Sequence, residues 1–246
     1  MQTEQSIFHN TVILGDCLEE MQKLPDKSVD MICTDPPYFL PIQSYVGSME
    51  KGYEKRTLED CSILKGYFKQ IFREFIRVTK PSGVWYIFCN WESYPIFYEL
   101  IFPICHSIRP LIWDKTASVY GYTWRHQYEM ICFVTFSETE RIPTGDGDVL
   151  KCRGVPQKGR NHPAEKPVEL IKQLIMKHEN LKFILDPYSG SGSTIIACLQ
   201  TQRDYLGIEL NENYVKRINE RILEQTNGLN LWQTKVTSCQ KESKDA

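Results

Sequence analysis

The sequence lacks any long apolar run: no stretch approaches the roughly 20 residues that a membrane-spanning helix needs. Its first residues, MQTEQ, carry neither the basic start nor the apolar stretch of a secretory signal peptide. We therefore expect a cytoplasmic protein. Hydrophobic residues make up 41% of the chain and charged residues 24%, which is ordinary for a soluble globular protein.

Paired cysteines and clustered histidines are also missing. The nine cysteines are scattered, no two are separated by two residues, and the five histidines show no ligand spacing. This pattern argues against a zinc or iron–sulfur site, so we expect no metal, with the cysteines acting as small buried hydrophobes in a reducing compartment. The net charge of −2 gives no overall basic signal. Any surface that binds nucleic acid must therefore be local.

What the chain does contain is an alternation of strand-like and helix-like segments over 246 residues. The predicted strands are 11–14, 29–34, 84–89, 108–115, 128–136, 182–185 and 205–208. The predicted helices are 17–24, 64–75, 94–102, 167–177, a short one from about 194 to 198, and an amphipathic one around 215–222. This order predicts an α/β fold with a doubly wound, mostly parallel sheet in a single domain, 1–246.

Three segments break the alternation. Residues 39–61 mix proline, glycine and charge without periodicity and predict a mobile loop. Residues 137–161 are rich in glycine, proline and charge and predict a short insertion, and the polar tail 227–246 is expected to fray.

The first motif is ICTDPPYFL, residues 32–40, where an apolar run meets an acid, two prolines and an aromatic residue. Two successive prolines cannot donate to a sheet and fix the backbone, so a strand must end here. The simplest interpretation is a strand-ending turn. An alternative is that the turn holds Asp35 for chemistry, which depends on the rest of the chain.

The second motif is ILDPYSGSGSTIIAC, residues 184–198. An apolar strand, a turn with Gly190 and Gly192, and a helix beginning near Thr194 let the backbone approach a ligand at the carboxyl edge of a parallel sheet. The next strand ends in Glu209, placed to accept hydrogen bonds from ribose hydroxyls. The third small residue of the dinucleotide fingerprint is missing at Ile195, which disfavours a nicotinamide oxidoreductase.

With these motifs the chain resembles the DNA amino-methyltransferases in their permuted β arrangement, where D-P-P-Y precedes the glycine turn. The resemblance covers nearly the whole chain and rests on several motifs in the family's order. They read GDCLEEMQKLPDKSVDMICTDPPY, RVTKPSGVWYIF, IWDK, HPAEKPVELI, DPYSGSGSTIIACL and GIELNENYVKRI. Tyr188 and Ser189 depart from the Phe-Ala or Phe-Gly of many members, although Ser189 is still small.

The resemblance implies a Rossmann-like methyltransferase fold and S-adenosylmethionine as the cofactor. The residues that it assigns to this cofactor are Asp16, Cys33, Thr34, Asp35, Lys166, Asp186, Pro187, Tyr188, Ser189, Gly190, Gly192 and Glu209. Asp16 would bind the adenine amine, Glu209 the ribose, and Lys166 with Pro167 would close over the methionine portion. The residue types also allow simpler interpretations: Asp16 as a helix N-cap, Glu209 as a solvated strand end, and Lys166 as a surface charge.

The resemblance also assigns the catalytic residues Asp35, Pro36, Pro37 and Tyr38. An exocyclic amine is a poor nucleophile until acceptors draw on its protons, and Asp35 with the rigidly held carbonyl of Pro36 would supply two acceptors. Tyr38 would stack on a base flipped out of the duplex. In this family an Asp before Pro-Pro usually goes with adenine N6, and a Ser or Thr more often with cytosine N4, so we expect an adenine N6-methyltransferase acting on double-stranded DNA.

Target recognition must come from the irregular segments. The candidate DNA-binding residues are basic or aromatic: Tyr45, Lys51, Arg56, Lys151, Arg153, Lys158 and Arg160. A solvated basic loop is the simpler interpretation. Because the 137–161 insertion is short for reading bases, we expect a homodimer, and a cognate restriction enzyme is a possible partner.

Rival functions remain open. They are an N4-cytosine DNA methyltransferase, a methyltransferase acting on RNA or protein glutamine, and a non-catalytic nucleic-acid-binding subunit. The last predicts an eroded catalytic tetrad, whereas Asp35 to Tyr38 are intact.

Overall fold

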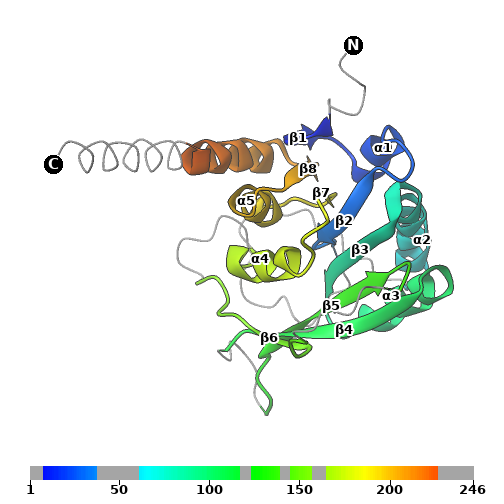
Figure 1. The fold of residues 1–246 in the computed structure, drawn as a ribbon. Helices are drawn as coiled ribbons and strands as arrows, with labels where there is room; N and C mark the ends of the chain where they lie inside the picture. Colours follow the sequence, from blue (N-terminus) through cyan, green and yellow to red (C-terminus); the bar gives the residue numbers. More distant parts are fainter. Residues whose placement is uncertain (1–7, 38–60, 117–122, 139–144, 157–164, 227–246) are drawn as a thin grey trace.

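The computed structural model describes residues 8–37, 61–116, 123–138, 145–156 and 165–226. Its centre is an eight-stranded sheet in the order β1-β8-β7-β2-β3-β5-β4-β6 (Figure 1). The strands are β1 (Thr11–Leu14), β2 (Val29–Thr34), β3 (Thr79–Cys89), β4 (Ser107–Asp114), β5 (Tyr128–Thr135), β6 (Val149–Lys151), β7 (Phe183–Asp186) and β8 (Asp204–Glu209). The helices are α1 (Cys17–Gln22), α2 (Cys61–Val78), α3 (Tyr94–Ile101), α4 (Val168–Met176) and α5 (Ser193–Gln200), with the short η3 (Phe102–Ile104) and a last helix over 212–226.

The sheet is mostly parallel, as the alternation of segments predicts. Strands β1, β8, β7, β2 and β3 run parallel to one another, β5 runs antiparallel to both β3 and β4, and the short β6 is parallel to β4. The predicted α/β class and doubly wound arrangement are confirmed. The carboxyl ends of the central parallel strands therefore lie at one edge of the sheet, where ligands of open α/β sheets bind.

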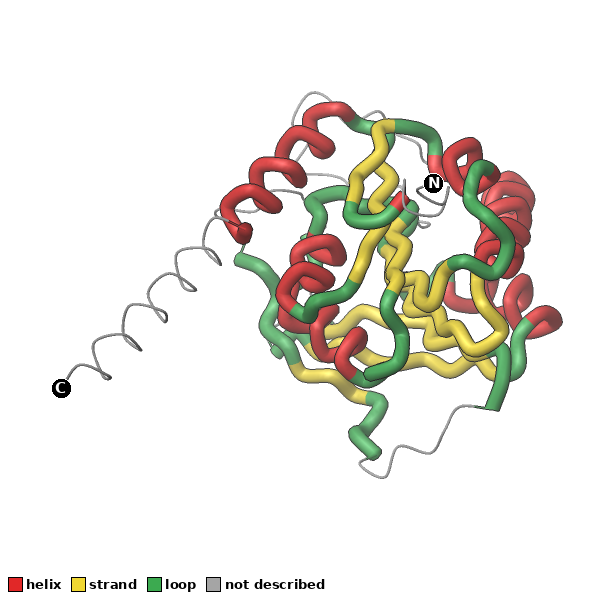
Figure 2. Tube along the Cα trace, turned by 45° about the horizontal axis from the view of Figure 1, so that its top comes forward, coloured by secondary structure: helices red, strands yellow, loops and turns green. Residues whose placement is uncertain are grey.

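Helices cover both faces of the sheet (Figures 1 and 2). Alternate residues of β2 enter different cores: Ile32 packs with α1, α2 and α3, whereas Met31 and Cys33 pack with α4, α5 and Ile218 of the last helix. This division follows from the pleat, which sends successive side chains to opposite faces. Because both faces are covered, every residue of β2 is buried, and the strand reads as a nearly continuous apolar run.

Two segments differ from their predicted form. Lys80 to Gly83 lie between the predicted helix 64–75 and the predicted strand 84–89, but β3 begins at Thr79 and includes them. A bulge opposite Val29 and Met31 accommodates the extra residues, and bulges are where a strand tolerates proline and glycine. A Cβ at Gly83 would lie 2.8 Å from the carbonyl oxygen of Asp30, so only glycine fits this close approach.

The segment 137–161, predicted as an irregular insertion, contains β6, which pairs with Ile112 to Asp114 of β4. Three residues are too few to produce a recognisable strand pattern. The predicted loop 39–61 lies outside the described residues except for its last residue, Cys61, which begins α2, and the tail 227–246 lies outside them altogether. No helix among the described residues is long and apolar enough to span a bilayer.

Candidate active site

Acidic residues meet at the carboxyl edge of the sheet. Strands β7 and β8 end in Asp186 and Glu209, and Asp35 directly follows β2, which neighbours β7. The antiparallel β5 begins at the same edge, because its Met130 pairs with Cys89 at the end of β3. This arrangement adds Glu129 to the three carboxylates that the sequence predicts at the edge.

The turn after β7 depends on its two glycines. Gly190 and Gly192 have φ values of 49° and 80°, which L side chains rarely adopt. A Cβ at Gly192 would lie 2.9 Å from Cγ1 of Ile218 in the last helix. Gly192 donates its N–H to the carbonyl of Ser189 at 2.7 Å and precedes α5 as its N-cap. The backbone of the turn is therefore held close to the strand ends, as the glycine pattern predicts.

Asp186 is buried beneath this turn. Its Oδ1 accepts a hydrogen bond from Thr34 Oγ1 at 2.7 Å and one from the Tyr188 N–H at 3.2 Å. Burial raises the pKa of Asp186 to about 6, although these hydrogen bonds oppose the rise. Thr34 and Asp186, both candidate cofactor-binding residues, are thus in direct contact, and this contact ties β2 to the glycine turn.

Glu209 fixes the other side of the turn. Its Oε2 accepts the Gly190 N–H at 2.8 Å, and its Oε1 accepts the Asn211 N–H at 2.8 Å. Burial raises the pKa of Glu209. Glu209 is half-buried, and both of its carboxylate oxygens accept backbone N–H groups, so it is held in place at the strand end.

Asp35 belongs to a buried ion network that the sequence does not reveal. Lys166 Nζ lies 2.6 Å from Asp35 Oδ2 and 3.1 Å from Glu129 Oε2, and Lys115 Nζ lies 2.7 Å from Glu129 Oε1. Lys166 is only 5% exposed, which excludes the interpretation of a surface charge. The other oxygen of Asp35, Oδ1, is buried and has no hydrogen-bond partner among the residues that the structure describes.

The charges of this network act on Asp35 in opposite directions. Burial raises the pKa of Asp35, Lys166 opposes this rise, and Glu129 adds to it. The net result is a pKa of about 6. Burial also favours protonation of Glu129, but Lys166 and Lys115 together hold its pKa below the usual range. At neutral pH both carboxylates are thus ionised, and the two lysines balance their charge.

Tyr188 departs from the family pattern, and the structure gives it a partner. Its hydroxyl lies 2.6 Å from the hydroxyl of Tyr67 on α2, which is also 3.8 Å from Cys17 Sγ. A phenylalanine would leave the Tyr67 hydroxyl without this bond. The signal in the sequence was the departure itself, but its partner lies 121 residues away and could not be named.

The remaining predicted residues are distributed as follows. Asp16 is the N-cap of α1 and accepts the Leu18 and Glu19 N–H groups at 2.9 and 3.2 Å, so its capping role is confirmed.

The other predicted residues differ in exposure: Cys33, Pro36 and Pro187 are buried, and Pro37 is exposed. Lys151 in β6 and Arg153 after it are exposed. Tyr38, Tyr45, Lys51, Arg56, Lys158 and Arg160 lie outside the described residues.

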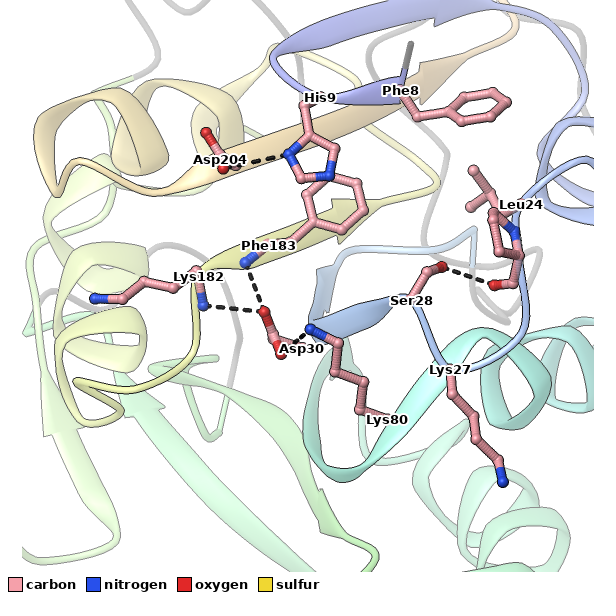
Figure 3. Close-up of a pocket in the computed structure, with 11 residues that line it drawn as sticks. Phe8, His9, Leu24, Lys27, Ser28, Asp30, Lys80, Lys182, Phe183 and Asp204 are labelled. Carbon is pink, nitrogen blue, oxygen red and sulfur yellow. Dashed lines mark hydrogen bonds and ion pairs between the residues drawn. The ribbon is translucent and has the colours of Figure 1, made fainter. Parts of the chain in front are cut away.

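A pocket of about 230 Å³ lies at the opposite edge of the sheet, where the parallel strands begin (Figure 3). It is bordered by Asp30, whose Oδ1 binds Lys80 Nζ at 2.7 Å and whose Oδ2 accepts the Phe183 N–H at 2.9 Å. His9 stacks on Phe183 and reaches Asp204. This pocket is separate from the carboxylates at the carboxyl edge. Among the described residues, no group of three or more histidines, cysteines or acids could hold a metal ion.

The chain also resembles known proteins in sequence and in fold. Residues 29–220 match the N6/N4 family model described as DNA methylase. The chain is 31% identical to YubD of Escherichia coli (strain K12) over 217 residues, 85% of this chain and 88% of YubD. It is 27% identical over 244 residues to the DNA adenine methyltransferase YhdJ of the same organism, covering 84% of this chain and 80% of YhdJ.

Solved structures share the fold. A complex of M1.HpyAVI with SAM has a TM-score of 0.63 at 20% identity, covering 86% of this chain and 98% of that one. The cytosine-N4-specific PvuII DNA methyltransferase has a TM-score of 0.66 at 14% identity, covering 85% of this chain and 84% of that one. The family match spans the sheet from β2 to the last helix and includes both the Asp35 turn and the glycine turn. The chain belongs to the N6/N4 family of DNA methylases.

Proposed function

We propose that the protein transfers a methyl group from S-adenosylmethionine to the exocyclic N6 amine of adenine in double-stranded DNA. One observation carries this proposal within the family: Asp35 Oδ1 is a buried carboxylate oxygen with no hydrogen-bond partner among the described residues. A buried acceptor without a partner costs free energy, so its persistence supports a ligand that donates to it. An amine bearing two N–H bonds is such a donor.

The residues of the glycine turn fit the cofactor. Positive φ values at Gly190 and Gly192 open the backbone beside the strand end, and Glu209 is fixed where its carboxylate can accept from ribose hydroxyls. Asp186 offers a buried carboxylate at the turn, and it is proposed to face the methionine portion of the cofactor. When bound, S-adenosylmethionine supplies an electrophilic methyl group on a sulfonium. Asp16 is proposed to accept from the adenine amine of the cofactor.

The chain's own residues prepare the amine. Asp35 Oδ1 and the carbonyl oxygen of Pro36 accept its two N–H bonds, which favours a tetrahedral nitrogen with an available lone pair. As the nitrogen gains the methyl carbon, the bond from that carbon to sulfur breaks and the nitrogen must lose one proton. Asp35 Oδ1 is the acceptor in line for that proton, because its pKa of about 6 keeps it ionised and basic at neutral pH. Tyr38, outside the described residues, is proposed to stack on the flipped base.

The choice of adenine rests on Asp35 in the first position of the tetrad and on the relative YhdJ, which is named as a DNA adenine methyltransferase. The second candidate is cytosine N4, because a structure of this fold is named as cytosine-N4-specific. Both bases carry an exocyclic amine with two N–H bonds, so the geometry of Asp35 suits either one.

The experiment that tests the proposal labels DNA with isotopic S-adenosylmethionine and identifies the modified base by mass spectrometry of the nucleosides. We expect N6-methyladenine from the wild type, and from Asp35→Ala a loss of at least about 10³-fold in rate with nearly unchanged cofactor affinity. Asp26→Ala, which removes an exposed carboxylate before β2, is the control and should keep the wild-type rate. N4-methylcytosine as the product would favour the second candidate, and an active Asp35→Ala would overturn the assigned roles.

We also propose a homodimer on DNA, because the short segment 137–161 offers few side chains for reading bases. Light scattering of the protein with cofactor and duplex tests this assembly. A monomer at every concentration that gives full activity would refute it. A cognate restriction enzyme is a further proposed partner.

A further inference from the structure

We propose that Lys166 and Glu129 are positioning residues for Asp35: their buried ion pair holds one carboxylate oxygen in place, presents the other to the substrate amine, and sets the acid limit of activity. The inference rests on the proposed function, since it takes Asp35 as the group that accepts the amine's hydrogen. It adds to that function two residues from distant segments, one before α4 and one in β5.

The geometry fixes the orientation of the Asp35 carboxylate. Lys166 Nζ contacts Oδ2 at 2.6 Å, whereas Oδ1 has no hydrogen-bond partner among the described residues. Oδ2 therefore fixes the carboxylate, and Oδ1 is left to accept a hydrogen bond from a substrate. Lys166 itself is held from several sides: Glu129 Oε2 lies 3.1 Å from its Nζ, and the Phe88 ring centroid lies 5.4 Å away. Its neighbour Pro167 caps α4 and restricts the backbone at that point. The lysine therefore has little freedom to leave Asp35.

Glu129 is needed because a lone lysine would over-stabilise the ionised Asp35. A cation at 2.6 Å favours the carboxylate form and makes the oxygen a weaker proton acceptor. Glu129 shares the lysine's charge and repels Asp35, which offsets this effect. Lys115, bound to the other oxygen of Glu129, keeps Glu129 ionised and gives the group two cations and two carboxylates.

Three other titratable groups near Asp35 are affected by its charge. The Asp35 carboxylate raises the pKa of Asp186 and of the buried thiols Cys33 and Cys89. These thiols stay neutral at physiological pH. Burial raises the pKa of Cys33, and the hydrogen bond with Cys132, together with burial, raises that of Cys89. The charges that face Asp35 are therefore those of Lys166, Glu129 and Lys115, together with that of Asp186, which has a pKa of about 6 and titrates over the same range as Asp35.

Because Lys166 and Glu129 carry opposite charges, removing them should move the acid limb of the pH–rate profile in opposite directions. Glu129→Gln is nearly isosteric and removes a negative charge, so the acid limb of the pH–rate profile should move to lower pH by roughly 0.5–1 unit. Lys166→Met removes the positive charge and the hydrogen bond, so the limb should move to higher pH by roughly 1 unit or more, with at least a tenfold loss of rate at pH 7. A merely structural role would lower the rate at all pH values and leave the limb in place.

The experiment measures single-turnover methyl transfer from pH 5 to 9 for both variants, with cofactor affinity and thermal unfolding recorded for each. Lys65→Met and Glu99→Gln are the matched controls, because they make the same changes in the exposed ion pair between α2 and α3. Both controls should keep the wild-type profile. If Lys166→Met fails to fold, Glu129→Gln still decides the question, and an unshifted acid limb in that variant would overturn the inference.

A second measurement does not depend on activity. Carboxyl carbons of aspartate labelled with ¹³C are titrated by NMR, and the Asp35 signal is identified by its loss in Asp35→Asn. The Asp35 midpoint should lie near pH 6 in the wild type and lower in Glu129→Gln. If this shift appears while no base in DNA is methylated, the proposed function fails and the ion network stands. If DNA is methylated but the midpoint is unchanged, the inference fails alone.

Discussion

The hydroxyl groups of Tyr67 on α2 and Tyr188 in the turn after β7 lie 2.6 Å apart. This bond joins the helix that covers one face of the sheet to the turn proposed to hold the cofactor. It also explains how a tyrosine is accommodated where a phenylalanine is more usual in the family.

A double-mutant cycle tests this bond. Tyr67→Phe and Tyr188→Phe should each lower the free energy of unfolding by about 1 kcal/mol, because each leaves the other hydroxyl partly buried with a lost partner. The double variant should cost less than the sum, with a coupling of about 0.5–1.5 kcal/mol. Urea unfolding measures all three. Tyr98→Phe, at an exposed position on α3, is the control, and strictly additive costs would contradict the pairing.

The glycine at position 192 should resist substitution. Gly192→Ala places a Cβ 2.9 Å from Ile218 Cγ1 at a φ of +80°, so we expect a loss of roughly 1–3 kcal/mol in unfolding free energy and weaker cofactor binding. Gly66→Ala is the matched control. Apart from its chain neighbours and the backbone of α2 itself, no atom of the described residues lies within 4 Å of its Cβ position, so this substitution should stabilise the protein by roughly 0.5–1 kcal/mol. Thermal unfolding and calorimetry with S-adenosylmethionine give both readings, and equal effects at the two glycines would be the contrary result.

The buried Asp186 should make stability depend on pH. Its pKa is about 6 in the folded protein against 3.8 in the unfolded chain, so the folded state binds the proton more tightly. The contribution of Asp186 to the unfolding free energy is therefore most favourable below pH 3.8 and falls as the pH rises to about 6. Above pH 6 it no longer changes with pH. Asp186→Asn removes this loss and should raise the unfolding free energy at pH 7 by on the order of 1–3 kcal/mol.

Urea unfolding at pH 4 and pH 7 measures the effect of Asp186→Asn, and the gain should shrink at the lower pH. Asp148→Asn, at an exposed site, should change little at either pH. A gain of the same size at both values would mean that the carboxylate's charge is not its cause.

The exposed basic residues of the β6 segment should contribute to DNA binding through phosphate contacts. Lys151→Ala and Arg153→Ala should each weaken binding similarly for all sequences and reduce the slope of log K against log salt by about 1. Fluorescence anisotropy between about 50 and 200 mM salt measures the slope. Lys216→Ala, which removes a lysine paired with Glu212 on the last helix, is the control. Unchanged slopes for both β6-segment variants would remove this segment from the interface.

The parallel core could be predicted from the sequence because its signals are local. Strands such as β2 are covered on both faces and read as continuous apolar runs, and Asp186 and Glu209 are recognisable as acids at strand ends. The glycine turn is likewise visible, because only glycine adopts the required φ freely. These features depend on a few neighbouring residues each.

The ion network could not be predicted because its members come from distant segments. Lys166 and Asp35 are separated by 131 positions, and Glu129 reaches the site only because β5 runs antiparallel to β3. Strand direction at that point is not encoded in either strand's own pattern. The one signal was an acid near the start of the apolar segment YEMICFVTF, which is unusual for a buried strand.

Asp30 determines how far β2 can slide past its neighbours. A strand that is apolar on both faces could shift by two residues and bury much the same surface. Asp30 opposes such slippage, because its carboxylate binds Lys80 near the start of β3 and the Phe183 N–H at the start of β7. Asp35 follows five residues later, about 17 Å along an extended chain. The position at which Asp35 leaves the sheet is therefore set by Asp30, a polar residue that is bound near the start of the same strand.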